Sequence, residues 1–202
     1  MDPGAKKELR LVAGVPAIRK CVEAFVVSGC CNHFVVTHSE TGRPQMEAAL
    51  AGLSSKIIWV RGGATRQQSV YRALSALAEL KPGIVLIHDG ARPWISPSLI
   101  RSIFEGTVEF GACIPVVPLT DAPKRISAGG CVAEHMDKTA IANAQTPQGF
   151  RFAEILEAHK AARASGNDYS DDAEAYDAVV GPVFTVVGDP ANRKITYGCD
   201  LA

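Results

Sequence analysis

Short apolar runs alternate along this chain with longer segments in which apolar residues recur every three or four positions. The short runs predict β-strands, and they cover residues 33–37, 56–60, 84–87, 112–117 and 183–187. The longer period predicts α-helices, and it covers about residues 16–27, 44–51, 67–80, 98–105, 152–164 and 171–180. Most of the chain therefore repeats a β-α unit.

The predicted strands are apolar at nearly every position rather than at alternate positions. Such strands are buried on both faces, which is typical of a parallel sheet covered by helices. We therefore predict an α/β fold with a doubly wound, Rossmann-like, mostly parallel sheet and helices on both faces. The chain has no internal repeat, low-complexity tract or evident linker, so we expect residues 1–202 to form a single domain.

A different pattern follows Pro118. Residues 124–127 and 131–135 resemble two short strands around a turn that contains Gly129 and Gly130. This hairpin has few core positions of its own, so we expect residues 118–140 to project from the domain as an arm.

The composition excludes several classes of protein. The chain has 21 basic and 21 acidic residues, so it has no excess positive charge for binding nucleic acid or an anionic membrane. No apolar run approaches the roughly 20 residues that span a bilayer, and the first residues lack the apolar core of a signal peptide. The six cysteines and five histidines show no metal-binding spacing. We expect a cytoplasmic protein with reduced thiols.

Two opposite charges follow the apolar run of residues 84–87. Asp89 and Arg92 would lie at the carboxyl end of a strand, where open α/β sheets bind ligands. A carboxylate there can hold Mg²⁺ beside a substrate phosphate, and an arginine can bind phosphate. In the alternative interpretation, Asp89 caps the next turn and Arg92 only pairs with it.

A second candidate site follows the strand at 56–60. Gly62 and Gly63 would let a ligand approach the backbone, just before a helix whose N-terminus suits an anionic or polar ligand. Thr65 could cap that helix, and Arg66 and Ser69 lie one turn apart on it. A tight turn before a capped helix explains the same pattern without a ligand.

Three further stretches carry weaker signals. Residues 144–150 read as an uncharged loop, and the pair Arg193 and Lys194 is either a phosphate site or a solvated basic patch. Ser170 is the expected N-cap of the helix that follows, with Asp171 and Asp172 in its first turn.

Six stretches, taken in order, resemble the 2-C-methyl-D-erythritol 4-phosphate cytidylyltransferases of the non-mevalonate isoprenoid pathway. They read GGATRQQSV, VLIHDGARP, PLTDAPK, AQTPQGF, SDDAEA and NRKIT. The resemblance extends from about Lys6 to the C-terminus and is greatest to the bifunctional form, in which a cyclodiphosphate synthase domain follows. It implies a single nucleotidyltransferase domain that uses CTP and Mg²⁺ to convert the sugar-alcohol phosphate to its CDP derivative with release of pyrophosphate.

The resemblance also assigns roles to individual residues. It implies catalytic roles for Lys7, Lys194 and Arg92, and a metal ligand in Asp89, which also contacts CTP. The implied CTP-binding residues are Gly62, Gly63, Ser69 and Asp89, and the implied substrate-binding residues are Arg92, Thr146, Lys138 and Asp121. Because the arm resembles the one through which family dimers reach each other's active sites, a homodimer is implied as well.

Several positions depart from the family pattern. The family's N-terminal strand and Gly-rich phosphate loop have no counterpart among the residues that match, so we expect this chain to lack that cradle for the triphosphate. Ala64 and Ala122 stand where aspartate and threonine are usual, and Lys138 stands where the arm carries an arginine. Two alternatives follow, namely a cytidylyltransferase for another polyol phosphate such as ribitol 5-phosphate, or an inactive remnant that at most binds nucleotide.

Overall fold

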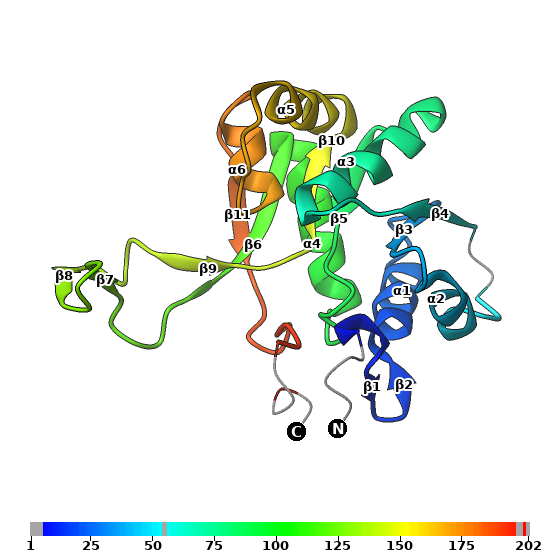
Figure 1. The fold of residues 1–202 in the computed structure, drawn as a ribbon, viewed down its shortest axis with the longest axis horizontal. Coiled ribbons are helices and arrows are strands. Elements are labelled where there is room, and N and C mark those ends of the chain that lie inside the picture. The colour runs from blue at the N-terminus through cyan, green and yellow to red at the C-terminus, as the bar shows by residue number, and fades with distance from the viewer. Residues whose placement is uncertain (1–5, 54–55, 197–199, 201–202) are drawn as a thin grey trace.

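We analysed a computed structural model that describes residues 6–53, 56–196 and 200 (Figure 1). Its largest sheet has the strand order β11-β6-β10-β5, and β9 pairs with the far end of β6. The bounds of these strands are β5 Ile84–Ile87, β6 Ala112–Pro118, β9 Ala142–Ala144, β10 Gln148–Arg151 and β11 Phe184–Val187. The carboxyl end of β5 lies at the edge of the sheet where the site described below is built.

Helices cover both faces of the sheet, as the sequence predicts. The helices are α1 Ala17–Ser28, α2 Arg43–Ala49, α3 Arg66–Leu77, α4 Pro97–Phe110, α5 Phe152–Ser165 and α6 Asp172–Asp177, with 3₁₀ turns η1 Lys7–Leu9 and η2 Ala78–Leu80. Helix α5 contacts α3 and α6, while α4 packs along the strands of the largest sheet and contacts α1. The predicted α/β class is confirmed.

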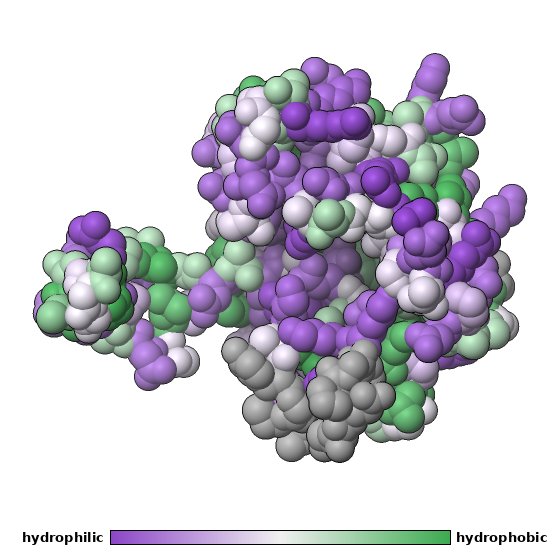
Figure 2. Space-filling view, viewed as in Figure 1, coloured by the Kyte–Doolittle hydropathy of each residue, from purple (hydrophilic) through white to green (hydrophobic). Residues whose placement is uncertain are grey.

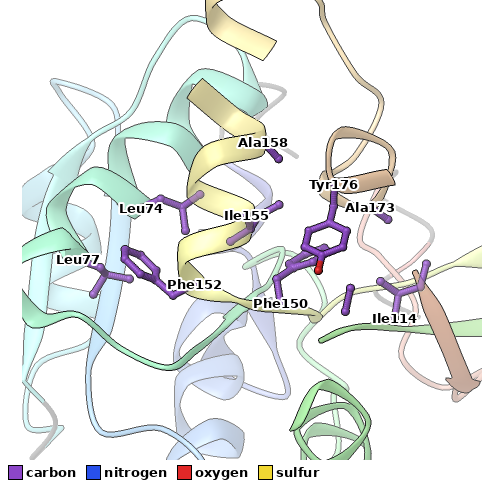
Figure 3. Packing of buried hydrophobic residues seen from close by; sticks show 10 residues of the cluster. Leu74, Leu77, Ile114, Phe150, Phe152, Ile155, Ala158, Ala173 and Tyr176 are labelled. Atoms are coloured by element: carbon purple, nitrogen blue, oxygen red, sulfur yellow. The ribbon is translucent and has the colours of Figure 1, made fainter. Parts of the chain in front are cut away.

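The core under α5 shows why these elements pack as they do. Phe150 of β10 and Ile155 of α5 are completely buried, and Leu74 of α3 and Tyr176 of α6 close around them (Figure 3). Complete burial of side chains of this size contributes about 1.5–3 kcal/mol each. The apolar period of residues 152–164 therefore places one stripe of α5 against the sheet.

The sequence prediction of an uncharged loop over residues 144–150 is wrong for residues 148–150, which lie in a strand, Gln148–Arg151. This strand, β10, lies between β5 and β6 and is antiparallel to both. Gln148 is buried, and its side chain donates to Asp171 and accepts from the backbone N–H of Ala173. A polar residue whose hydrogen bonds are satisfied in the core hides the apolar pattern from which strands are predicted.

The sheet is divided between β3 and β5. Strand β3 (Phe34–His38) pairs in parallel with β4 (Ile57–Arg61), and in the described part of the chain the two form a separate sheet. A cavity of about 1040 Å³ separates β3 from β5, between α1 on one side and α3 on the other. Its lining is apolar along the strands and becomes charged at the end where Asp89 and Lys194 lie.

The predicted arm is confirmed as a hairpin. Strands β7 (Lys124–Ile126) and β8 (Val132–His135) pair in antiparallel fashion, and every residue of both is exposed. Figures 1 and 2 show that the arm stands well away from the body of the molecule. A smaller antiparallel pair, β1 (Leu11–Val12) and β2 (Val15–Pro16), follows η1.

The remaining global expectations concern thiols and membranes. Among the described residues, Cys21, Cys30, Cys31, Cys113 and Cys131 are free, as expected, and Cys199 lies outside the described part of the chain. No helix in the described ranges is long and apolar enough to cross a membrane.

Candidate active site

The candidate active site is built around Asp89, two residues beyond the end of β5. Its side chain is 16% exposed and contacts two cations, with Oδ2 2.7 Å from Lys194 Nζ and Oδ1 3.3 Å from Arg66 Nε. Arg66 is the first residue of α3, and Lys194 comes from the segment after β11. Three segments remote in sequence therefore meet at one carboxylate.

The two cations keep Asp89 ionised. Burial alone would raise its pKa, but the hydrogen bond and charge of Lys194, together with the charge of Arg66, lower the pKa to about 2. Asp89 is therefore an anion throughout the neutral range, with both oxygens directed at positive groups.

Arg92 does not pair with Asp89, so the alternative in which these two charges simply neutralise each other is wrong. Its guanidinium donates through Nη1 to the backbone carbonyl of Asn192 at 2.8 Å. Its backbone N–H donates to the Asp89 carbonyl, which closes the turn after β5. Burial lowers the pKa of Arg92, and Asp89 only partly offsets this effect. Arg92 and Asp89 thus act as separate charges at one edge of the sheet.

Thr146 lies behind Asp89 and fixes its backbone. The Thr146 hydroxyl accepts from the Asp89 N–H at 3.1 Å and lies 3.1 Å from Nδ1 of His88, whose Nε2 faces the Arg92 carbonyl. Burial lowers the pKa of His88 to about 4, despite the nearby Asp89 charge. A neutral imidazole that accepts from Thr146 and donates to Arg92 satisfies every group in this chain of hydrogen bonds.

The glycine loop folds onto the first turn of α3. Thr65 is the N-cap, as predicted, and accepts from the Gln68 N–H at 3.2 Å. Ser69 accepts from the Gly63 N–H at 3.0 Å and donates to the Thr65 carbonyl. A Cβ at Gly63 would lie 2.3 Å from Cβ of Gln68, so the close approach of loop and helix requires glycine.

This loop borders an open hollow of about 510 Å³. The backbone of Gly62 and Gly63 lines it together with Ser39, Glu40, Arg61, Ala64 and Arg72. Arg72 donates to the carbonyls of Arg61 and Gly62, which fixes the loop from the helix side. The N–H groups of Gly62, Gly63 and Ala64 donate within the protein, to the His38 carbonyl, the Ser69 hydroxyl and the Gln68 side chain, so the loop is held rigidly beside the hollow.

The other predicted site residues fall into two groups. Lys7 is exposed in η1 and lines the large cavity together with Asp89 and Lys194. Asp121 and Lys138 lie in the arm, which projects from the body in Figure 1. The chain therefore brings Lys7, Lys194, Asp89, Arg92 and Thr146 to one edge of the sheet and holds Asp121 and Lys138 on the arm.

Sequence reasoning missed an ion-pair chain behind Asp89. Arg66 also contacts Asp172 at 2.7 Å, and Asp172 contacts His159 at 3.1 Å, with both of these residues 1% exposed. The prediction that Ser170 caps α6 is wrong, because Asp171 is the N-cap and accepts from the Glu174 N–H. The run of three polar residues left the choice of cap open, and nothing in the sequence pattern singled out Arg66 as their partner.

Comparison with known proteins places this site in a family. A family model described as 2-C-methyl-D-erythritol 4-phosphate cytidylyltransferase (IspD) matches residues 1–202. The bifunctional enzyme IspD/IspF of Rhodopseudomonas palustris (strain ATCC BAA-98 / CGA009) is 41% identical over 204 residues, which cover 98% of this chain and 50% of the relative. The protein of the same name from Nitrobacter hamburgensis is 42% identical over 199 residues, which cover 96% and 48%. The chain spans about half the length of the curated relatives it matches.

Solved structures agree with the sequence comparison. The 2-C-methyl-D-erythritol 4-phosphate cytidylyltransferase of Thermus thermophilus superposes with a TM-score of 0.84 at 32% identity and covers 98% of this chain and 91% of its own. A 4-diphosphocytidyl-2C-methyl-D-erythritol synthase from Anaerococcus prevotii reaches 0.89 at 24% identity, with 98% and 89% covered, and supports the fold alone. The resemblance inferred from the six stretches is confirmed.

Proposed function

The chain belongs to the 2-C-methyl-D-erythritol 4-phosphate cytidylyltransferase family, and from this premise we propose that it transfers CMP from CTP to 2-C-methyl-D-erythritol 4-phosphate. The observation that carries the proposal is the family match over residues 1–202, together with Asp89 and Lys194 at the carboxyl end of β5. The reaction belongs to isoprenoid precursor synthesis by the non-mevalonate pathway.

The reaction needs charge neutralisation more than proton transfer. An oxygen of the acceptor phosphate attacks the α-phosphorus of CTP, the bond from that phosphorus to the bridging oxygen breaks, and pyrophosphate leaves with the bonding electron pair. Both reactants are anions, so the protein must hold them in line and stabilise charge that grows on the leaving group. Lys7, Lys194 and Arg92 are the cations that we assign to this task.

Asp89 is the residue that we expect to hold Mg²⁺. No group of three His, Cys, Asp or Glu side chains that could bind a metal occurs within the described ranges, so a bound ion would depend on this one carboxylate. One ionised carboxylate plus substrate phosphates is a donor set that suits Mg²⁺. When bound there, the ion would supply positive charge to the phosphates during transfer.

Lys194 must then move from Asp89 to the phosphates. Its side chain is 42% exposed and long enough to turn, whereas Asp89 is held by the Thr146 hydrogen bond to its backbone. Arrival of an anionic nucleotide gives Lys194 a second partner of higher charge than the carboxylate.

The glycine loop is the proposed site for the nucleotide base. Gly62 and Gly63 line the open hollow, and the Ser69 hydroxyl of α3 accepts from the Gly63 N–H, which holds the loop against the helix. A ring with both donors and acceptors, such as cytosine, can pair with backbone groups without any charged side chain.

The arm is the proposed route to a homodimer. Asp121, Lys138 and the apolar residues Ile126, Val132 and Met136 lie on it, and all of them are exposed. A second copy would bury those apolar side chains and bring Lys138 and Asp121 toward an acceptor phosphate near Arg92 and Thr146. We also propose a cytoplasmic location and, on the pattern of the bifunctional relatives, association with a cyclodiphosphate synthase domain.

One assay tests the proposed function. Pyrophosphate release is measured with CTP, Mg²⁺ and 2-C-methyl-D-erythritol 4-phosphate, and in parallel with ribitol 5-phosphate at equal concentration. We expect turnover with the first acceptor and little with the second. A folded sample that turns over neither acceptor contradicts the proposal, and a preference for ribitol 5-phosphate would instead favour the alternative suggested by Ala122 and Lys138.

A further inference from the structure

Arg66 lies between two carboxylates that have different surroundings. Its Nε faces Asp89 Oδ1 at 3.3 Å and its Nη2 faces Asp172 Oδ2 at 2.7 Å. Asp89 lies at the charged end of the large cavity, whereas Asp172 is 1% exposed. The shorter contact is therefore the one to the carboxylate that solvent does not reach.

Asp172 is itself fixed by a buried histidine. His159 Nε2 of α5 lies 3.1 Å from Asp172 Oδ1, and Nδ1 of the same ring is buried with no partner among the described residues. A proton on Nε2 lets His159 donate to Asp172. Both oxygens of Asp172 are then satisfied, one by His159 and one by Arg66.

The two cations on Asp89 differ in freedom. Lys194 is a flexible chain that is 42% exposed, while Arg66 is a planar fork held at its far edge by Asp172. Arg66 contacts both carboxylates, and a guanidinium remains a cation in proteins, so Arg66 keeps its charge beside Asp89 whether or not Lys194 turns away. When Lys194 has turned away, Asp89 and Asp172 carry two negative charges and Arg66 carries one positive charge. The group then has a net charge of minus one, which favours binding of a divalent cation.

We propose that Arg66 is a positioning residue of this site. Arg66 holds Asp89 from one side. Asp172, which His159 fixes, anchors Arg66 and balances its positive charge. The negative charge of Asp89 therefore remains available to a metal ion. The expected effect of Arg66 on kcat rests on the proposed function. The anchoring of Arg66 by Asp172 rests on the contacts between the two side chains alone.

Direct measurement of metal binding tests the inference without turnover. Mn²⁺ is titrated into the 202-residue chain with CTP and without acceptor, free Mn²⁺ is followed by electron paramagnetic resonance, and the Mn²⁺ bound by the same CTP concentration without protein is subtracted. In Asp172→Asn the charge of Arg66 falls on Asp89 alone, and we expect Mn²⁺ affinity to drop roughly 10- to 100-fold, as for other groups that orient metal ligands. Asp177→Asn, which removes an exposed carboxylate from the same helix, is the matched control and should bind as the unaltered chain does.

A double variant separates charge balance from general damage. Arg66→Gln combined with Asp172→Asn removes the positive charge that fell on Asp89, so Mn²⁺ affinity should recover in part relative to Asp172→Asn, while it stays below that of the unaltered chain and kcat stays low because Asp89 has lost the contact that holds it. Circular dichroism verifies that each variant is folded. If Asp172→Asn fails to fold, Arg66→Lys provides the test, since it keeps the charge but cannot span both carboxylates and should lower kcat about 10-fold or more.

The outcomes distinguish the two proposals. Unchanged Mn²⁺ affinity in folded Asp172→Asn, or a double variant no better than the single one, overturns the anchoring role. Normal kcat in Arg66→Lys overturns it as well. Metal binding that follows the expected pattern in a chain without turnover overturns the proposed reaction and leaves the role of Arg66 intact, whereas absence of Mn²⁺ binding in the unaltered chain overturns both the metal assignment and this inference.

Discussion

Lys194 Nζ lies 2.7 Å from Asp89 Oδ2, although the two residues are 105 positions apart in the chain. The pair joins the end of β5 to the segment after β11 and sits at the charged end of the large cavity. Because Lys194 is 42% exposed, water screens the attraction and the pair contributes little to stability. We therefore assign the pair a functional role, in which Lys194 leaves the ionised carboxylate of Asp89 and contacts a substrate phosphate instead.

Replacement of Lys194 tests whether the residue contributes to function and not to stability. Lys194→Gln should lower kcat for pyrophosphate release by roughly 100- to 1000-fold, the usual cost of losing one group aimed at developing charge. The melting temperature should fall by no more than about 2–4 °C, since a pair with a half-exposed lysine contributes about 0–1 kcal/mol. Lys160→Gln, which breaks another exposed pair on α5, is the control and should retain full activity. A large loss of stability without loss of kcat would assign Lys194 to the fold instead.

Gly149 tests the packing of β10 against α4. A Cβ at this position would lie 2.1 Å from Thr107 Oγ1 and 2.9 Å from a Leu86 methyl group, and Thr107 is completely buried. Gly149→Ala should therefore reduce the free energy of unfolding by about 1–3 kcal/mol, the usual cost of overpacking a core. Gly129→Ala, in the arm, meets nothing within 4 Å and should leave stability nearly unchanged. Urea denaturation of both variants makes the comparison, and equal midpoints would show that the core can accommodate the methyl group.

Apolar periodicity predicted the helices and most strands because each of them buries one stripe or one run of side chains. The helix predicted over 152–164 is α5, Phe152–Ser165, and the strand predicted at 84–87 is β5. The method failed at β10, where Gln148 is buried through hydrogen bonds instead of apolar contacts. It also gave no warning that β3 and β5 do not pair, since periodicity reports burial and not the identity of a neighbouring strand.

The candidate site also has features that the sequence predicts and features that it does not. Asp89 and the glycine loop were predictable because each follows an apolar strand, and such loops meet at one edge of the sheet. The partners of Asp89 were not predictable, since Arg66 and Lys194 reach it from positions 23 residues earlier and 105 later. Local sequence suggested Arg92 as the partner because it is three residues away, yet its guanidinium turns to Asn192. Tertiary packing decides which charges meet.

His88 should make stability depend on pH between about 4 and 6.5. Its pKa is about 4 in the folded chain because it is buried, and about 6.5 when unfolded. As pH falls through this window, the unfolded chain binds a proton that the folded chain does not, so this group lowers the free energy of unfolding by about 1.4 kcal/mol per pH unit. Above pH 6.5 the contribution is constant.

Urea unfolding at pH 7, 6 and 5 without added divalent metal measures this slope. His88→Gln keeps a polar side chain near Thr146 but cannot titrate, so its stability should fall less steeply with acidification than that of the unaltered chain. His135→Gln, in the exposed strand β8, is the control and should keep the full slope. Parallel curves for the unaltered chain and His88→Gln would mean that the pKa of His88 does not differ between the folded and unfolded chains.

The divided sheet predicts a pattern of hydrogen exchange. Among the described residues, β5 pairs only with β10 and β3 pairs only with β4, and a cavity of about 1040 Å³ lies between the two strands. Backbone N–H groups that face this cavity lack the ladder partner that protects amides in a continuous sheet. The inner strand β10, which pairs with both β5 and β6, has no such edge.

Deuterium uptake followed by mass spectrometry on peptides from each strand tests this prediction. About half of the amides in β3 and β5 should exchange early, because alternate residues of an edge strand direct N–H groups away from the ladder. Those of β10 should persist until global unfolding. A probe of the cavity, the apolar dye 1-anilinonaphthalene-8-sulfonate, should slow exchange in β3 and β5 and leave the arm unchanged, since its apolar rings suit the lining from Ile18 and Phe25 on α1 and Leu74 on α3. Equal protection of the amides of β3, β5 and β10 without the dye would mean that the two sheets join in solution. The apolar cavity between β3 and β5 would then be closed, and Asp89 and Lys194 would no longer lie at its end.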